Sequence, residues 1–387
     1  MPAINVPQPE FMDDEEIAIF ADAVGKFYQQ HAPEKRVLKW REDGQVEREF
    51  WNEAGEAGLL GVSVPEEYGG HGGDFRHDMV VIDQQAKNGV EGFAASLHNT
   101  VILPYLVRHG TEEQKKKYLP KLVTGELVSA IAMTEPGVGS DLQSITTTAL
   151  KDGNGYRING AKTYISNGQT ADFIIVVAKT DPNERAKGIS LMLLETEGAE
   201  GFQRGKKLDK VGMDAADTSE LFFDDVFVPA ENVLGGEEGK GFYQLMGELP
   251  QERLIIAMGA MTGIEKALET TLDFVKNRKA FGQTIWDFQN TQFVMADLKA
   301  RATAAKIFVN DCIAKHLKRE LDVPTACMAK YWVTDIQGET IDEMLQLHGG
   351  YGYMNEYPIA RLWKDARVQR IYGGTSEIMK EVIGRSL

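Results

Sequence analysis

Two glycines and two hydroxyl side chains follow an apolar run in the first half of the chain, where they could bind a polar ligand. The run from Leu127 to Met133 predicts a buried strand, which ends before Pro136 because proline fixes φ and lacks a backbone donor. Gly137 to Asp141 then leave backbone N–H groups uncovered beside the hydroxyls of Thr134 and Ser140. Such donors suit an anionic or polar ligand, but the pattern alone favours a tight turn between strands with an aspartate cap.

A second motif lies near the other end of the chain. It reads Gln346-Leu347-His348-Gly349-Gly350-Tyr351-Gly352-Tyr353 and is followed by Glu356, Arg361 and Asp365. In type and spacing, the two motifs together resemble the acyl-CoA dehydrogenase family, above all its long-chain type. The resemblance runs from the N-terminal helices to residues 371–378 and so covers nearly the whole chain.

The resemblance implies an FAD cofactor, which needs partners for its ring, its pyrophosphate and its adenine. The resemblance places six residues at the flavin ring and its edge: Ile131, Met133, Thr134, Ser140, Tyr164 and Ser166. Many members have tryptophan and threonine where Tyr164 and Ser166 stand. At the rest of the cofactor it places Arg278, Phe281, Gln289, Gln346, Gly349, Gly350, Thr375 and Glu377.

Arg278 and the loop from Gln346 to Gly350 carry an implication about assembly. In this family they reach the flavin of a neighbouring subunit, so the resemblance implies a homotetramer built as a dimer of dimers. An arginine fork suits phosphate oxygens. Taken alone, Arg278 is better explained as a cation near a helix C-terminus, which interacts favourably with the helix dipole.

Removal of an α-proton from an acyl thioester requires a carboxylate. Many family members carry this glutamate in the late loop, at the position that Gly373 holds here. The long-chain and isovaleryl types carry it on a helix directly before an arginine, which matches Glu252 and Arg253. The two observations support each other and make Glu252 the expected base. By itself, Glu252 could also be a surface glutamate in the first turn after Pro250.

The remaining candidates concern the substrate. The Gly373 backbone N–H matches the family donor that polarises the thioester carbonyl. Residues matching the thioester and pantetheine channel are Ser140, Phe242, Tyr243, Arg253 and Tyr372, each of which alone fits a structural role as well. Gly92 and Ser96 are expected at i,i+4 on one helix face, where medium-chain members carry bulkier polar residues. Small residues there predict room for a longer or branched acyl chain.

Three segments must position these groups, and together they predict an α+β multidomain fold. Residues 1–126 show apolar positions at helical spacing, as from Ile17 to Phe27, and predict an all-α domain. Residues 127–238 show short apolar runs separated by Gly- and Asn-containing turns, 152–156 and 166–170 among them, which predict an antiparallel, barrel-like sheet. Residues 239–387 predict a four-helix bundle, with helices at 242–277, 286–321, 324–347 and after 375.

Composition narrows the class of protein. With 387 residues, 43% of them hydrophobic, the chain can bury real cores. Cys312 and Cys327 lack metal-like spacing, so no metal site is expected. The net charge of −16 argues against nucleic-acid binding. Neither a membrane span nor a targeting segment is evident, which predicts a cytoplasmic protein.

The predicted function is oxidation of a saturated acyl-CoA to the trans-2-enoyl-CoA, with electrons passed to an electron-transferring flavoprotein. One alternative is an acyl-CoA oxidase that uses oxygen, although such chains usually carry a further C-terminal helical region. Another is a flavin-bearing relative that binds nucleic acid and has lost dehydrogenase chemistry. The acidity of the chain and the presence of Glu252 speak against this second alternative.

Overall fold

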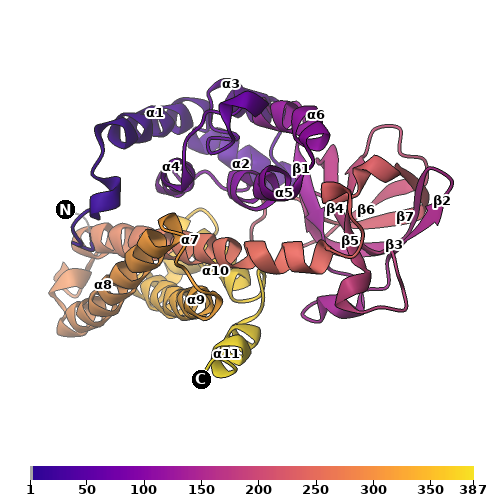
Figure 1. Ribbon diagram of the computed structural model, residues 1–387. Helices are drawn as coiled ribbons and strands as arrows, with labels where there is room; N and C mark the ends of the chain where they lie inside the picture. Colours follow the sequence, from indigo (N-terminus) through magenta and orange to yellow (C-terminus); the bar gives the residue numbers. More distant parts are fainter. Residues whose placement is uncertain (1–2) are drawn as a thin grey trace. The chain divides into compact units, whose positions relative to one another are not determined.

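The computed structural model describes residues 3–387, which form two compact units (Figure 1). One unit consists of residues 3–18, 211–213 and 250–387, and the other of residues 19–210 and 214–249. The predicted order of helices, sheet and helices along the chain is confirmed. The predicted boundaries of three domains, 1–126, 127–238 and 239–387, stay a prediction.

The N-terminal part is helical, as predicted. Its helices are α1 (Glu15–His31), α2 (Glu34–Asp43), α3 (Arg48–Glu56), α4 (Phe75–Lys87), α5 (Leu103–His109) and α6 (Glu112–Val123). Capping boxes at Asp74 and Thr111 begin α4 and α6, because these side chains accept backbone N–H groups of the first turn. Buried aromatic rings join the helices: Phe50 lies 4.7 Å from Trp40 and 4.8 Å from Phe93, between ring centroids.

The prediction that Gly92 and Ser96 share one helix face is wrong. Gly92 lies in a bend before the helix, which begins at Ala95 and continues as a π-helix over Leu97–Ile102. Its φ of +81° is left-handed, and a β-carbon there would lie 2.4 Å from the carbonyl oxygen of Ala215. Backbone geometry and a close approach therefore explain the glycine, without reference to acyl length.

The middle of the chain forms a seven-stranded sheet. Its strands are β1 (Ser129–Ala132), β2 (Thr148–Asp152), β3 (Gly155–Ser166), β4 (Phe173–Lys179), β5 (Ile189–Glu195), β6 (Phe202–Lys207) and β7 (Thr218–Pro229). Their order is β1-β4-β2-β3-β7-β6, with β5 beside β4. The sheet is mixed, not wholly antiparallel as predicted, because β4 runs parallel to β1 and β2.

Two predicted turns have different outcomes. The turn at 152–156 joins the antiparallel strands β2 and β3, as predicted. The turn at 166–170 leads from β3 to β4, and these two strands do not pair within the described residues. Strand β6 was not predicted, because its residues are mostly polar and lie partly or fully exposed.

The C-terminal part contains the long helices α7 (Gly241–Asn277), α8 (Gln289–Leu317) and α9 (Val323–Leu347), as predicted. A short hairpin of β8 (Lys279–Ala280) and β9 (Gln283–Thr284) joins α7 to α8. Two shorter helices, α10 (Pro358–Ala366) and α11 (Ser376–Gly384), pack against α9, as does α8 (Figure 1). Helix α10 was not predicted as a separate element.

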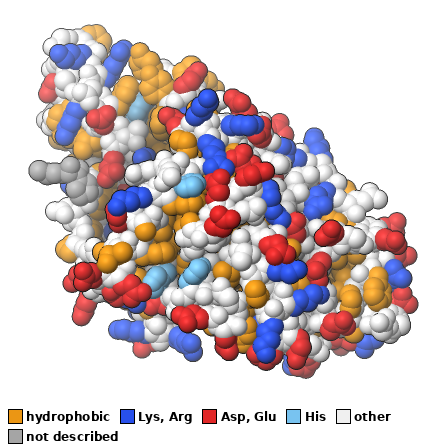
Figure 2. All heavy atoms as spheres, turned by 90° about the horizontal axis from the view of Figure 1, so that it is seen from above, with side chains coloured by type: hydrophobic (Ala, Val, Ile, Leu, Met, Phe, Trp, Pro, Cys, Tyr) orange, Lys and Arg blue, Asp and Glu red, His pale blue; other side chains and the backbone are white. Residues whose placement is uncertain are grey.

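One face of the molecule is of mixed charge. On the face seen in Figure 2, acidic and basic side chains are interspersed, with scattered hydrophobic side chains between them. Within residues 3–387, no helix is long and apolar enough to cross a membrane. The same residues contain no group of three or more potential metal ligands.

Candidate active site

The predicted base and the predicted main-chain donor are neighbours. Glu252 lies in α7 and is buried, with 7% of its surface exposed. Ile256 follows one turn later on the same helix face. Its Cδ1 atom is 2.4 Å from the place that a β-carbon on Gly373 would occupy. The fold therefore brings the helix face of Glu252 against the loop that contains Gly373.

This loop depends on two consecutive glycines. Gly373 and Gly374 have φ values of +62° and +96°, which other residues rarely adopt. After them, Thr375 caps α11 by accepting the backbone N–H of Ile378 at 3.3 Å. Glu377 is exposed in the first turn of α11, and Tyr372 is partly exposed at 39%. For Thr375, the structure thus gives a local role as a helix cap.

Two buried cations lie at the same loop. The Nη2 atom of Arg253 is 4.0 Å from the place of a β-carbon on Gly374, and its Nη1 atom donates to the Sγ atom of Cys327 at 3.2 Å. Lys330 is fully buried and donates from Nζ to the Gly374 carbonyl at 2.7 Å. Sequence analysis missed Lys330. The available signal was its place in an otherwise uncharged, buried stripe of α9 with Ala326 and Val333.

The end of β1 is held by a buried ion pair, Lys162 with Glu135, that was not predicted from the sequence. Lys162 is fully buried and donates from Nζ to the Met133 carbonyl at 2.9 Å and to Glu135 at 3.0 Å. Glu135 also accepts the backbone N–H groups of Thr146 and Thr147, at 2.7 and 2.9 Å. Burial alone would raise the pKa of Glu135, but the Lys162 charge and these hydrogen bonds lower it to about 2.

The predicted ring-edge residues come together only in part. Two hydrogen bonds join Thr134 and Thr163. The Thr163 N–H donates to the Thr134 carbonyl at 2.9 Å, and the Thr134 hydroxyl donates to the Thr163 carbonyl. Met133 and Thr134 therefore lie beside the segment that carries Tyr164, as predicted. The Thr134 hydroxyl uses its proton within the protein, so in this arrangement it can offer a ligand only an acceptor.

Tyr164 is directed outward by an irregularity in β3. The pairing of β3 with β7 shifts register between Lys162 and Ile165, and Tyr164 has a left-handed φ of 60°. Its side chain is 71% exposed, and Ser166 is exposed as well. Bulges of this kind re-aim side chains and are common beside functional sites. The ring is therefore available to a ligand.

The glycine loop after β1 has a turn at its start. Glu135 and Val138 exchange backbone hydrogen bonds of 2.8 and 3.0 Å, so a tight turn is present, but it does not join two strands directly and Asp141 makes no side-chain cap hydrogen bond. Ser140 beyond the turn is exposed, and β-carbons on Gly137 or Gly139 would meet nothing within 4 Å. Open space therefore surrounds the two glycines, which were interpreted as a ligand loop.

Arg278 and one residue of the 346–350 loop, His348, line the same pocket, whereas their predicted role at the cofactor stays a prediction. A pocket of about 400 Å³ is lined by Arg278, His348 and Tyr351, among others. The Arg278 guanidinium lies 5.1 Å from the Tyr351 ring centroid, and His348 stacks on Phe274 at 4.2 Å. Burial lowers the pKa of His348, which favours the neutral imidazole. The pocket thus combines a fixed cation with aromatic walls.

Other predicted cofactor residues lie at the surface. Phe281 has a left-handed φ of 51° and is 96% exposed, although its ring is 6.3 Å from that of Phe288. Gln289 and Gln346 are exposed at helix ends, and Gly349 has a φ of 58°. A fully exposed phenylalanine in a strained conformation is uncommon unless something covers it.

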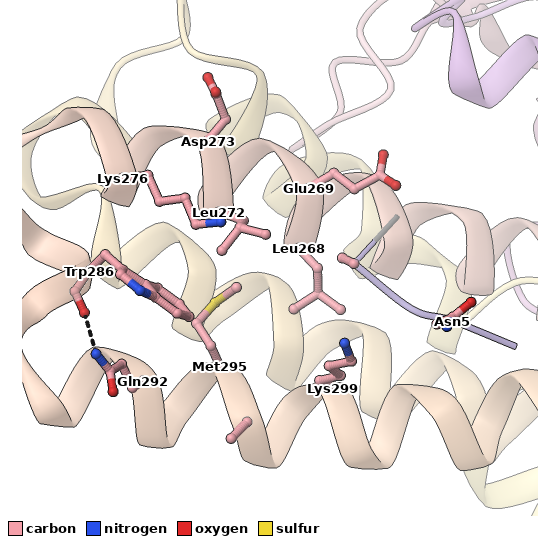
Figure 3. A pocket seen from close by; sticks show the side chains of 12 residues that line it. Asn5, Leu268, Glu269, Leu272, Asp273, Lys276, Trp286, Gln292, Met295 and Lys299 are labelled. Atoms are coloured by element: carbon pink, nitrogen blue, oxygen red, sulfur yellow. Dashed lines mark hydrogen bonds between the residues drawn. The ribbon is translucent and has the colours of Figure 1, made fainter. Parts of the chain in front are cut away.

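A larger cavity, of about 1190 Å³, lies between α7 and α8 (Figure 3). Its wall includes Leu272, Met295 and Trp286, with the Lys276 ammonium 5.5 Å from the Trp286 ring. Gln292 donates to the Trp286 carbonyl at 3.1 Å (Figure 3). None of the predicted site residues lines this cavity.

Phe242 and Tyr243 lie at the start of α7, with ring centroids 6.2 Å apart and Tyr243 53% exposed. They belong to the same compact unit as Ser96, Ser140 and Ile131, whereas Glu252 and Gly373 belong to the other. A channel formed by these residues stays a prediction.

Comparison with known proteins is consistent across the chain. Three family models match: the acyl-CoA dehydrogenase N-terminal domain at residues 14–126, the middle domain at 130–226 and the C-terminal domain at 239–387. The mouse mitochondrial long-chain specific acyl-CoA dehydrogenase is 48% identical over 371 residues, which cover 95% of this chain and 86% of that protein.

Solved structures agree with these matches. An acyl-CoA dehydrogenase from Geobacillus kaustophilus is 47% identical, with a TM-score of 0.94 over 96% of this chain and 98% of that chain. A glutaryl-CoA dehydrogenase from Mycobacterium smegmatis in complex with FADH2 is 26% identical, with a TM-score of 0.89 over 98% and 96%. The predicted fold is thereby confirmed.

Proposed function

The chain belongs to the acyl-CoA dehydrogenase family of oxidoreductases, and from this premise we propose that it oxidises a saturated acyl-CoA to the trans-2-enoyl-CoA with FAD as its cofactor. Electrons then pass to an electron-transferring flavoprotein. Similarity to long-chain specific relatives supports a medium, long or branched acyl group.

The observation that carries this proposal is the pairing of Glu252 with Gly373. The loop position from which many family members supply the base is here a glycine, and Ile256 fills the space beside it. One turn before Ile256, the chain provides a buried carboxylate. The chain therefore has a candidate base at Glu252 and no carboxylate at position 373, where many family members carry theirs.

In this proposal, each group of the chain has one task. The Glu252 carboxylate accepts the α-proton, while the Gly373 backbone N–H donates a hydrogen bond to the thioester oxygen, where negative charge develops. Arg253 and Lys330 place positive charge beside the same loop. Bound FAD would supply the acceptor for the β-hydrogen, which leaves as hydride.

The residues present fit FAD. Arg278 in its aromatic pocket suits a pyrophosphate, and the exposed rings of Tyr164 and Phe281 suit contacts with the flavin and adenine parts. The complex of a relative with FADH2 supports this assignment. We propose that Arg278 and Phe281 act on the cofactor of a neighbouring subunit in a homotetramer.

The experiment that tests the proposal replaces the base. Glu252→Gln keeps volume and polarity but cannot accept the proton, so acyl-CoA should still bind while flavin reduction falls by a factor of ~10³ or more. Glu265→Gln is the matched control on the same helix, since Glu265 pairs with Lys306 at 3.0 Å, away from the loop. Flavin bleaching at the parent rate in Glu252→Gln would move the base elsewhere.

The oxidase alternative has its own measurement. Oxygen consumption with stoichiometric hydrogen peroxide during acyl-CoA oxidation would favour an oxidase over a dehydrogenase. Transfer of electrons to an electron-transferring flavoprotein, with little peroxide, would favour the proposal. For the nucleic-acid-binding alternative, tight binding to duplex DNA at physiological salt is the deciding result.

A further inference from the structure

Lys330 is the residue at this loop that the proposed chemistry does not yet explain. It lies in the middle of α9 and has no exposed surface. A buried ammonium group is costly unless it is paired and hydrogen-bonded. Its Nζ atom donates a hydrogen bond of 2.7 Å to a backbone carbonyl, that of Gly374, and not to a carboxylate.

The hydrogen bond to Gly374 supports the part of the loop that has no side chains to hold it in place. Gly373 and Gly374 both have left-handed φ values and lack side chains that could pack. On the C-terminal side, the Thr375 cap fixes the chain to α11. Lys330 joins the Gly374 carbonyl to α9. The position of the Gly373 N–H therefore depends on this hydrogen bond and on the Thr375 cap.

Arg253 adds a second cation at the same place. Its Nη2 atom lies 4.0 Å from the β-carbon position of Gly374, and its Nε atom has no hydrogen-bond partner among the described residues although the side chain is only 5% exposed. Arg253 therefore has a buried donor at this place that no described residue uses. Arg253 is close enough to Lys330 to lower the pKa of the Lys330 ammonium group.

We propose that Lys330 is a positioning residue, which holds the Gly373–Gly374 loop for hydrogen bonding to the thioester and, with Arg253, makes the loop electropositive where the substrate gains negative charge. The part of this inference that concerns the thioester substrate rests on the proposed function. The first half, a loop held in place by Lys330, can be measured without any reaction.

Burial and the charged groups around Lys330 set the pKa of its ammonium group. Burial and then Arg253 lower the pKa of Lys330 to about 8, against the opposing effects of Asp335, Cys327 and Glu377. Asp335 also pairs with Arg370 at 2.6 Å. The Lys330 charge is therefore present at neutral pH and is lost as the pH rises through about 8.

The test compares three variants of the flavin-loaded protein. Lys330→Met removes the charge and the donor at similar length, and Lys330→Arg keeps both. Thr334→Val is the control, because the Thr334 hydroxyl donates to the Lys330 carbonyl at 2.9 Å within α9 and does not reach the loop. The first measurement is hydrogen exchange of a peptide covering residues 371–376.

We expect faster exchange of this peptide in Lys330→Met, and parent-like exchange in Lys330→Arg and Thr334→Val. Parent-like exchange in Lys330→Met would overturn the anchoring role, whether or not the protein is a dehydrogenase. If no acyl-CoA reduces the flavin of the parent protein, the proposed function is wrong. The exchange measurement would still show whether Lys330 holds the loop.

The second measurement follows flavin reduction by acyl-CoA. We expect Lys330→Met to reduce its flavin ~100-fold more slowly at saturating substrate, with little change in substrate affinity, because misplacement by ~1 Å can have this effect. The parent rate should fall as the pH rises through about 8, and Lys330→Met should lack this fall. A change in affinity alone, with the parent pH profile kept, would exclude a role in the reaction.

Discussion

The Cδ1 atom of Ile256 lies 2.4 Å from the position that a β-carbon on Gly373 would need, so the two residues compete for one space. Contacts of real β-carbons are essentially never this short. The left-handed φ of +62° favours glycine at position 373, and the Ile256 methyl group occupies the space beside it. A base placed on this loop would require the Ile256 side chain to move or to be shortened.

This competition predicts how the base could be moved. Glu252→Ala with Gly373→Glu should remain almost inactive, because the new side chain meets Ile256. Adding Ile256→Val removes the obstructing Cδ1 atom and should raise the rate of flavin reduction at least ~10-fold, still below the parent because the φ at position 373 is strained. Rapid mixing with acyl-CoA measures the rates, and equal rates with and without Ile256→Val would contradict the steric argument.

Arg278→Ala should weaken flavin retention without loss of fold. The substitution removes a cation from the aromatic pocket of Tyr351 and His348, whereas Lys279→Ala removes an adjacent exposed cation outside this pocket. We expect flavin content after dilution and gel filtration to fall several-fold in Arg278→Ala only. Full flavin content in both variants would remove Arg278 from the cofactor site.

The Glu135–Lys162 pair predicts acid sensitivity. The pKa of Glu135 is about 2 when folded, against 4.5 for an ordinary glutamate, so its contribution to stability is present above pH 4.5 and is lost as the pH falls towards 2. Linkage makes this contribution about 3 kcal/mol. Glu135→Gln should flatten stability between these pH values, as measured by denaturant unfolding.

The partner of this pair provides the control. Glu135→Gln leaves Lys162 buried without its carboxylate and should destabilise the protein by ~3–5 kcal/mol at pH 7. Glu135→Gln with Lys162→Met removes both charges and should be the more stable variant of the two. If the double variant is less stable than the single one, the unpaired charge is not the source of the loss.

Gly92 should be intolerant of a side chain for structural reasons. Gly92→Ala places a methyl group against the Ala215 carbonyl, whereas Gly89→Ala meets nothing within 4 Å at a similar φ of +68°. Both substitutions carry the conformational cost of a left-handed residue, about 1–2 kcal/mol. Thermal unfolding should show a clearly larger loss for Gly92→Ala, and equal losses would contradict the close approach.

Acyl length is then tested at Ser96 alone. Ser96→Gln adds bulk in the helix without the backbone conflict at Gly92. If the acyl chain runs past Ser96, the rates for long acyl-CoA substrates should fall relative to those for short ones. An unchanged profile across chain lengths would place the acyl tail elsewhere.

Periodicity and short motifs determined much of this protein. Helical spacing predicted α7 to α9, and the resemblance carried by two motifs led to Glu252, Gly373 and Arg278. These signals lie within short stretches of sequence, so they can be recognised without knowledge of what packs against them. The meeting of Arg278 with the 346–350 loop was expected only through the resemblance.

The tertiary structure decided which groups share a buried space. Sheet pairing is non-local, so the parallel neighbours of β4 could not be read from the alternation of its residues. Helical spacing also failed at Gly92, because a left-handed bend breaks the pattern there. Lys162 and Lys330 look like ordinary surface lysines in the sequence. Their burial is possible because distant carbonyls, those of Met133 and Gly374, accept hydrogen bonds from the ammonium groups, and only the fold brings these groups within hydrogen-bond distance.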